Sequence, residues 1–83
     1  MADDKFTLGT DADRQQASVW LDLLDQEIDA TSDAIEEAQR KARAEHRVGA
    51  VDRARRFDNE VAKLSASLRE LHRMRRNLDD RFP

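Results

Sequence analysis

The sequence predicts an all-α protein, an antiparallel, coiled-coil-like hairpin of two helices that dimerises into a four-helix bundle. Three observations predict this fold: apolar residues recur at heptad spacing in two segments, the pattern breaks once between them, and helix-breaking residues are scarce. The 83 residues include two Gly and one Pro, and 5% of them are aromatic. Sandwiches and barrels need turn residues about every 8–12 positions, so this composition argues against them. A chain of this length forms one small domain.

The first helix is expected over about residues 11–48, after a flexible tail at residues 1–10 that lacks periodicity. Nothing in this stretch breaks a helix, and Thr10 followed by Asp11 and Asp13 resembles a capping box. Its apolar seam advances in steps of three and four residues. The seam positions are Leu21, Leu24, Ile28, Thr31, Ile35, Ala38 and Ala42.

The heptad pattern breaks near Gly49, which predicts a turn at about residues 49–51 and a second helix at about 52–80. Gly49 can adopt the left-handed conformation that ends a helix, and Asp52 is expected to cap the next one. The second seam consists of Phe57, Val61, Leu64, Leu68, Leu71, Arg75 and Leu78. Twelve of the fourteen seam positions are apolar, which is the pattern of two helices that pack along their whole length.

Folding the chain at Gly49 sets Ile28 opposite Leu71 and places small residues of one seam opposite large residues of the other near the turn. The same fold brings an acidic stretch, residues 22–37, beside a basic stretch, residues 63–76. The seam residue Arg75 is then expected to reach Asp22 and Asp25. One alternative stays open at this point: a single long helix, bent at Gly49, that pairs with another chain.

One flank of the hairpin is apolar or small, and it is the predicted protein interface. Two helices cover only one stripe of each other, so a lone hairpin of this size has a marginal core. The predicted interface residues are Trp20, Leu23, Ala30, Ala34, Ser67 and Met74. The expected partner is a second copy of the chain, in a dimer or a larger assembly, or another helical protein. The alternative is that Trp20 folds back over its own hairpin end, beside Arg81.

The turn end is basic. Residues 40–56 carry seven basic residues against two acidic ones, a net charge of +5. This end could contact nucleic acid or an acidic partner, or it could be a solvated charged face. The candidate contact residues are Arg43, Arg47, Arg53, Arg55 and Arg56.

The sequence predicts no catalytic, cofactor or metal site and no small-molecule substrate. Cysteine is absent, the two histidines lack metal-ligand spacing, and no phosphate-binding glycine loop occurs. We therefore expect a non-enzymatic assembly or adaptor protein, cytoplasmic and without membrane contact, acting through homo-oligomerisation or helix-mediated contacts. The alternative is a nucleic-acid-associated or regulatory protein that uses residues 40–56. Twelve Arg against three Lys is typical of GC-rich bacterial or phage genomes.

Overall fold

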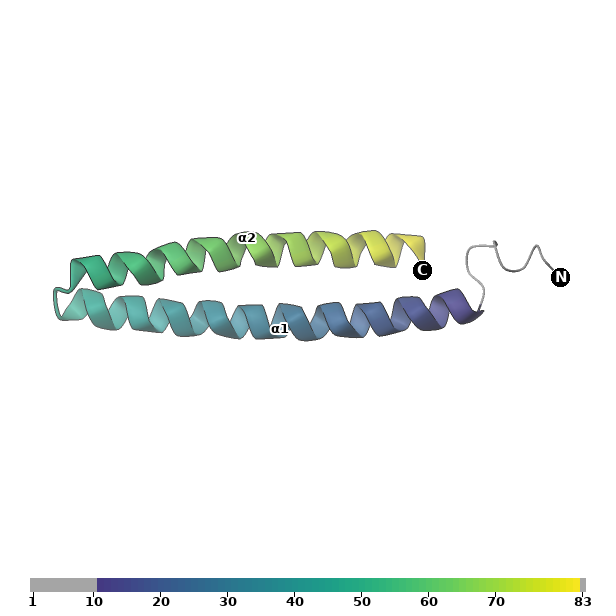
Figure 1. Cartoon of the computed structure of the whole chain (residues 1–83), viewed down its shortest axis with the longest axis horizontal. Coiled ribbons are helices and arrows are strands. Elements are labelled where there is room, and N and C mark those ends of the chain that lie inside the picture. Colours follow the sequence, from purple (N-terminus) through teal and green to yellow (C-terminus); the bar gives the residue numbers. More distant parts are fainter. Residues whose placement is uncertain (1–10, 83) are drawn as a thin grey trace.

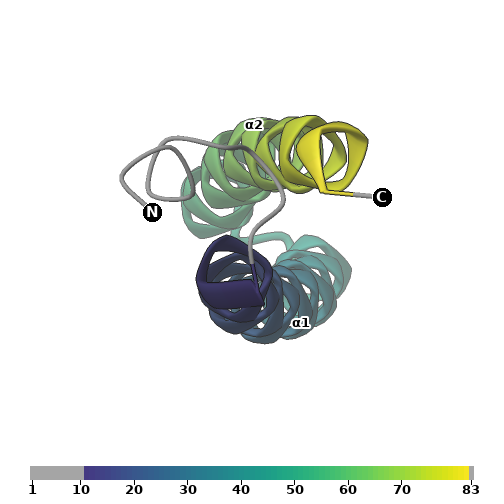
Figure 2. The same cartoon turned by 90° about the vertical axis from the view of Figure 1, so that its right-hand side faces the viewer.

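The protein is a hairpin of two helices, described over residues 11–82 by a computed structural model. Helix α1 spans Asp11–Arg47 and helix α2 spans Val51–Arg81. They lie side by side and antiparallel (Figure 1), inclined to one another when viewed along the hairpin (Figure 2). The predicted all-α hairpin is confirmed, and a single bent helix is excluded. The end of α1 and the start of α2 each lie one residue before the expected position, and the end of α2 lies one residue after it.

The expected tail at residues 1–10 and the expected cap at Thr10 lie outside the described residues. Across residues 11–82, neither helix is long and apolar enough to span a membrane.

The turn is built around Gly49, whose φ of 74° lies in the left-handed region, as the sequence predicted. Its N–H donates to the carbonyl of His46 at 3.1 Å, and the N–H of Ala50 donates to the carbonyl of Glu45 at 2.9 Å. These two bonds form a Schellman motif, which satisfies the last carbonyls of a helix. The motif lets the chain reverse within three residues, so the last turn of α1 can already pack against the first turn of α2.

The expectation that Asp52 caps α2 was wrong. Ala50 occupies the N-cap position, without a side-chain hydrogen bond, and Asp52 lies in the first turn. The reason is that the compact turn ends at Ala50, so α2 begins at Val51, one residue before the expected start. A carboxylate in the first turn still interacts favourably with the positive end of the helix dipole.

The core is thin. All fourteen seam positions are buried or half-buried, which confirms the two heptad series. The buried residues, however, are all small: Ala17, Thr31, Ala38, Ala42 and Ala54. Among the described residues, no large apolar side chain is fully buried. Each leucine, isoleucine or phenylalanine of the seam therefore keeps part of its surface in water, because only one other helix covers it.

Arg75 is the charged member of the seam, and it bridges the helices. Its Nε donates to Asp25 Oδ1 at 2.5 Å, and its Nη1 donates to Asp79 Oδ2 at 2.6 Å. The hydrogen bond with Asp25 and the attraction of the two carboxylates raise the pKa of Arg75 above its usual value. Asp25 is one of the two carboxylates that the sequence indicated.

Two further polar contacts join the helices near the turn. Arg53 Nε donates to Glu45 Oε2 at 2.7 Å, and His46 Nε2 lies 3.2 Å from Asp58 Oδ2. All these contacts are partly exposed, so each stabilises the fold little and mainly fixes how the helices are aligned.

Candidate functional site

A shallow groove lies at the open end of the hairpin, where the N-terminal half of α1 meets the C-terminal part of α2. We call it the open-end groove. Its lining residues are Trp20, Leu23, Leu24, Gln26, Glu27, Ala30, Met74, Asn77, Leu78 and Arg81. Three large apolar side chains in it are about half exposed: Trp20 at 53%, Leu23 at 49% and Met74 at 46%. Neighbouring apolar side chains that stay exposed are consistent with contact with a partner.

Helix periodicity explains why these residues meet. Trp20, Leu23 and Glu27 recur every three or four residues, so they share a face of α1 beside the seam. Met74 and Arg81 occupy the corresponding face of α2. The seam leucines of both helices lie between the two faces, and they are only half-buried.

The structure brings together four of the six predicted interface residues, namely Trp20, Leu23, Ala30 and Met74. Ala34 and Ser67 do not line the groove. Both lie closer to the turn, Ala34 half-buried and Ser67 exposed.

The sequence pattern did not indicate several of the groove residues. Leu24 and Leu78 were assigned only to the seam between the helices, but a two-helix core leaves one side of each open to the groove. Gln26 and Asn77 also line the groove. Their positions next to the apolar flank were the signal that could have identified them.

Trp20 is not covered by its own hairpin. It lines the groove together with Arg81, yet 53% of its surface remains exposed. Within residues 11–82, the cation–π contact lies elsewhere, with Lys41 Nζ 5.8 Å from the centre of the Phe57 ring. The indole is therefore accessible to a partner.

The turn end keeps most of its positive charge. All five candidate arginines are exposed, and Arg53 is paired with Glu45. The other four, Arg43, Arg47, Arg55 and Arg56, form no ion pair with any residue between 11 and 82.

Two valines at the turn are strongly exposed, Val48 at 73% and Val51 at 54%. The sequence pattern did not indicate that these two valines would be exposed. They lie just outside the two heptad series, where neither helix can cover them.

The side chains of the open-end groove are consistent with contact with a partner. Apolar side chains form most of it, the amides of Gln26 and Asn77 can form hydrogen bonds, and Glu27 and Arg81 carry opposite charges. In the described part of the chain, no three histidine or carboxylate side chains gather in a way that could hold a metal ion.

No known protein family, curated protein or solved structure matches this chain. The class of protein is therefore given by the fold alone: a small, extended helical hairpin with exposed apolar residues.

Proposed function

We propose that this protein is a non-enzymatic assembly or adaptor module that self-associates through the open-end groove, forming a four-helix bundle from two hairpins. The observation that carries the proposal is the exposure of Trp20, Leu23 and Met74 within a single groove. Aromatic residues and methionine are enriched in protein interfaces. Packing a second hairpin there would transfer this apolar surface out of water, which stabilises association.

The thin core supports the same proposal. The large seam residues are only half-buried, and the buried positions are alanines and one threonine. A four-helix bundle gives each helix two neighbours in place of one, so it completes the burial that a single hairpin begins.

The test is the mass of the protein in solution by light scattering, for the wild type and for Trp20→Asp. The matched control is Val51→Asp, which also replaces a half-exposed apolar residue with a carboxylate. Val51 is the first residue of α2, far from the groove, and an acid there suits the helix dipole. Circular dichroism establishes whether each variant keeps its helices.

We expect the wild type and Val51→Asp to have at least twice the 9.6 kDa mass of one chain, and Trp20→Asp to have the mass of a monomer with helical content retained or reduced. A wild type that remains a folded monomer at high concentration would refute self-association. The groove would then have to serve a different helical protein.

A second candidate function is contact with nucleic acid at the turn end. It is favoured by Arg43, Arg47, Arg55 and Arg56, which lack ion-pair partners among the described residues. Positive charge that is not neutralised within the protein is what binds phosphate groups.

This candidate predicts binding of a short DNA or RNA duplex at low salt, weakening as salt rises. Changing Arg43, Arg47 and Arg55 together to Glu would abolish it. The control is a change of Arg69 and Arg76 to Glu, two exposed arginines in the other half of α2. No detectable binding at low salt, or equal loss in both variants, would exclude a specific role for the turn end.

A further inference from the structure

The open-end groove continues toward the turn as a surface of mixed charge. Steps of three and four residues lead along each helix from the groove to this surface. On α1 the steps lead from Ala30 through Ala34 to Glu37, Lys41 and Glu45, and on α2 from Met74 through Glu70 and Ser67 to Lys63, Glu60 and Arg56. We call this whole surface, including the groove, the groove face.

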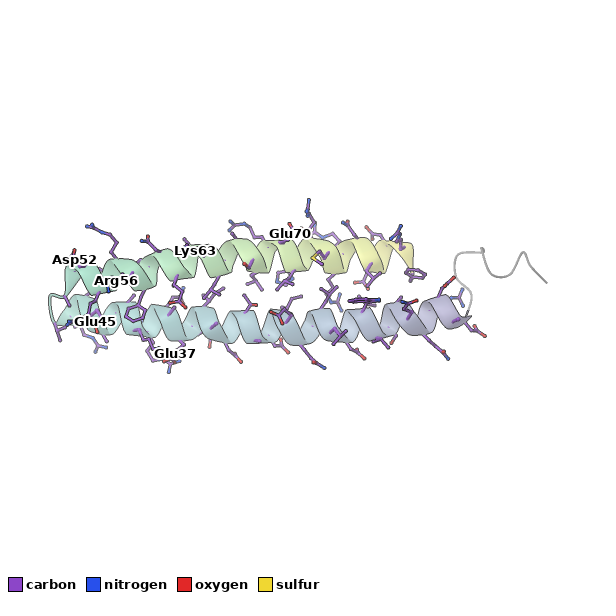
Figure 3. All side chains as sticks on the ribbon, viewed as in Figure 1. Glu37, Glu45, Asp52, Arg56, Lys63 and Glu70 are labelled. Carbon is purple, nitrogen blue, oxygen red and sulfur yellow. The ribbon has the colours of Figure 1, made fainter. Side chains whose placement is uncertain are left out.

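Along the length of the hairpin, charged residues of opposite sign on the two helices lie at similar positions. Lys63 on α2 lies at the level of Glu37 on α1, and Arg56 lies at about the level of Glu45 (Figure 3). The bond between Arg53 and Glu45 fixes the alignment of the two helices in this region.

Three of these charges have no ion-pair partner within one hairpin. Arg56, Glu60 and Lys63 form no ion pair with a residue in the described range. The acids at the levels of Lys63 and Arg56 pair with other residues: Glu37 contacts two basic residues of its own helix, and Glu45 contacts an arginine in the first turn of α2. Among the described residues, the groove face therefore carries two basic side chains and one acidic side chain without an ion-pair partner.

We infer that the second copy packs its groove face on this one with the two hairpins parallel, both turns at the same end. This inference rests on the proposed self-association and adds its direction. The two-fold axis then runs along the helices, so α1 of each copy lies beside α2 of the other at the same level.

In this arrangement, opposite charges meet across the interface. Glu37 of one copy faces Lys63 of the other, Lys41 faces Glu60, and Glu45 faces Arg56. Symmetry makes each pair twice. Complementary charges of this kind chiefly determine which arrangement of two partners forms.

The apolar residues distinguish parallel from antiparallel packing. Parallel hairpins place both open-end grooves together, so Trp20, Leu23 and Met74 of the two copies share one apolar cluster. If one copy were turned end for end about Ala34, Leu23 would meet Glu45 and Met74 would meet Glu60. Apolar surface would then be buried against two carboxylates. Glu60, which has no ion-pair partner among the described residues, would lose water without gaining a partner, which is costly.

Parallel packing also brings the two basic turn ends to the same end of the bundle. Arg43, Arg47 and Arg55 are exposed and lie outside the series that defines the groove face. The exposed arginines of the two copies repel each other there. Salt at physiological concentration screens charges in water beyond about 8 Å, so this repulsion opposes the contacts on the groove face only weakly.

The deciding experiment mixes two charge-reversed variants, Glu37→Lys and Lys63→Glu. Each variant alone places like charges together at two symmetric contacts, so its dimer should dissociate about tenfold more readily than the wild type. In an equimolar mixture, opposite charges meet again in the heterodimer, and we expect affinity close to that of the wild type. Charge changes inside each chain are the same alone and in the mixture, so the comparison isolates contacts between chains.

The outcomes separate this inference from the function on which it rests. A monomeric wild type refutes self-association itself. A dimeric wild type whose two variants gain nothing on mixing leaves self-association standing and overturns the parallel arrangement.

A distance measurement provides an independent test. The chain has no cysteine, so a spin label can be attached at one introduced site, Gln15→Cys, on an exposed position near the open end. Parallel packing predicts about 30 Å between the two labels, across the width of the bundle. End-for-end packing about Ala34 predicts roughly 55 Å, from the rise of 1.5 Å per residue. The longer distance would overturn the inference.

Discussion

Arg75 of α2 donates two hydrogen bonds to Asp25 of α1, from Nε to Oδ1 at 2.5 Å and from Nη2 to Oδ2 at 3.5 Å. The third nitrogen, Nη1, donates to Oδ2 of Asp79, one turn further along α2, at 2.6 Å. The pKa of Arg75 is raised in the folded protein. These contacts therefore stabilise the fold fully at any pH below the ordinary arginine pKa, and this stabilisation is lost only as the pH rises through the higher pKa of the folded state. The guanidinium therefore stays charged throughout the neutral range.

Replacing Arg75 with Leu should stabilise the protein. The position belongs to the apolar seam, and partly exposed ion pairs contribute little, so a half-buried leucine offsets the loss of both contacts. We expect a melting temperature higher by roughly 2–5 °C. Arg75→Ala, which removes the ion pairs without filling the seam, should melt below the wild type. A lower melting temperature for Arg75→Leu than for Arg75→Ala would contradict this account.

Gly49→Ala should destabilise the turn. The φ of 74° is unfavourable for any residue with a Cβ, although an added Cβ would meet no atom within 4 Å. The cost is therefore conformational, about 1 kcal/mol in the free energy of unfolding measured with urea. Gly49→Asn should cost less, because asparagine tolerates the left-handed region. Equal stability of the alanine variant and the wild type would show that the turn relaxes freely.

Ala54→Leu should force the helices apart near the turn. Ala54 has an exposed fraction of 0%, so a larger side chain has no space there. Overpacking of this kind costs about 1–3 kcal/mol in the free energy of unfolding. Ala62→Leu is the matched control, since Ala62 is an exposed alanine of the same helix, and its effect should stay within about 0.5 kcal/mol. Similar losses for both variants would mean that the residue type, and not the packing, is responsible.

The fluorescence of Trp20 should report association directly, because it is the one tryptophan in the chain. A half-exposed indole emits at longer wavelength than a buried one, so its emission should shift to shorter wavelength as the protein concentration rises. Met74→Asp, which places a carboxylate in the same groove, should keep the emission independent of concentration. An unshifted wild-type spectrum over a roughly thousandfold range of concentration would contradict burial of Trp20 in a dimer.

Much of the fold was predictable because heptad spacing is a local property. The steps from Leu21 to Ala42 and from Phe57 to Leu78 identify which face of each helix is covered, and every seam position is indeed buried or half-buried. Gly49 was identifiable as the turn because few other residues adopt a positive φ. The cap was not predictable: Asp52 is a favourable capping residue, but the geometry of the preceding turn moved the start of α2 to Val51.

The site was predictable only in part. Trp20, Leu23, Ala30 and Met74 were recognisable as an apolar flank from their spacing, and they do meet in one groove. Leu24 and Leu78 were not, because the sequence cannot show how much of a seam residue a single neighbouring helix leaves open.

The sequence by itself determined that two amphipathic helices form, where the chain turns and which faces meet, because these follow from periodicity and from one glycine. Only the tertiary structure decided how deeply each face is covered and which charges find partners. Burial depends on the distance and number of neighbouring helices, and an ion pair depends on where two flexible side chains end. That is why Asp25 pairs with Arg75, why Lys63 has no ion-pair partner within residues 11–82, and why Trp20 remains half exposed.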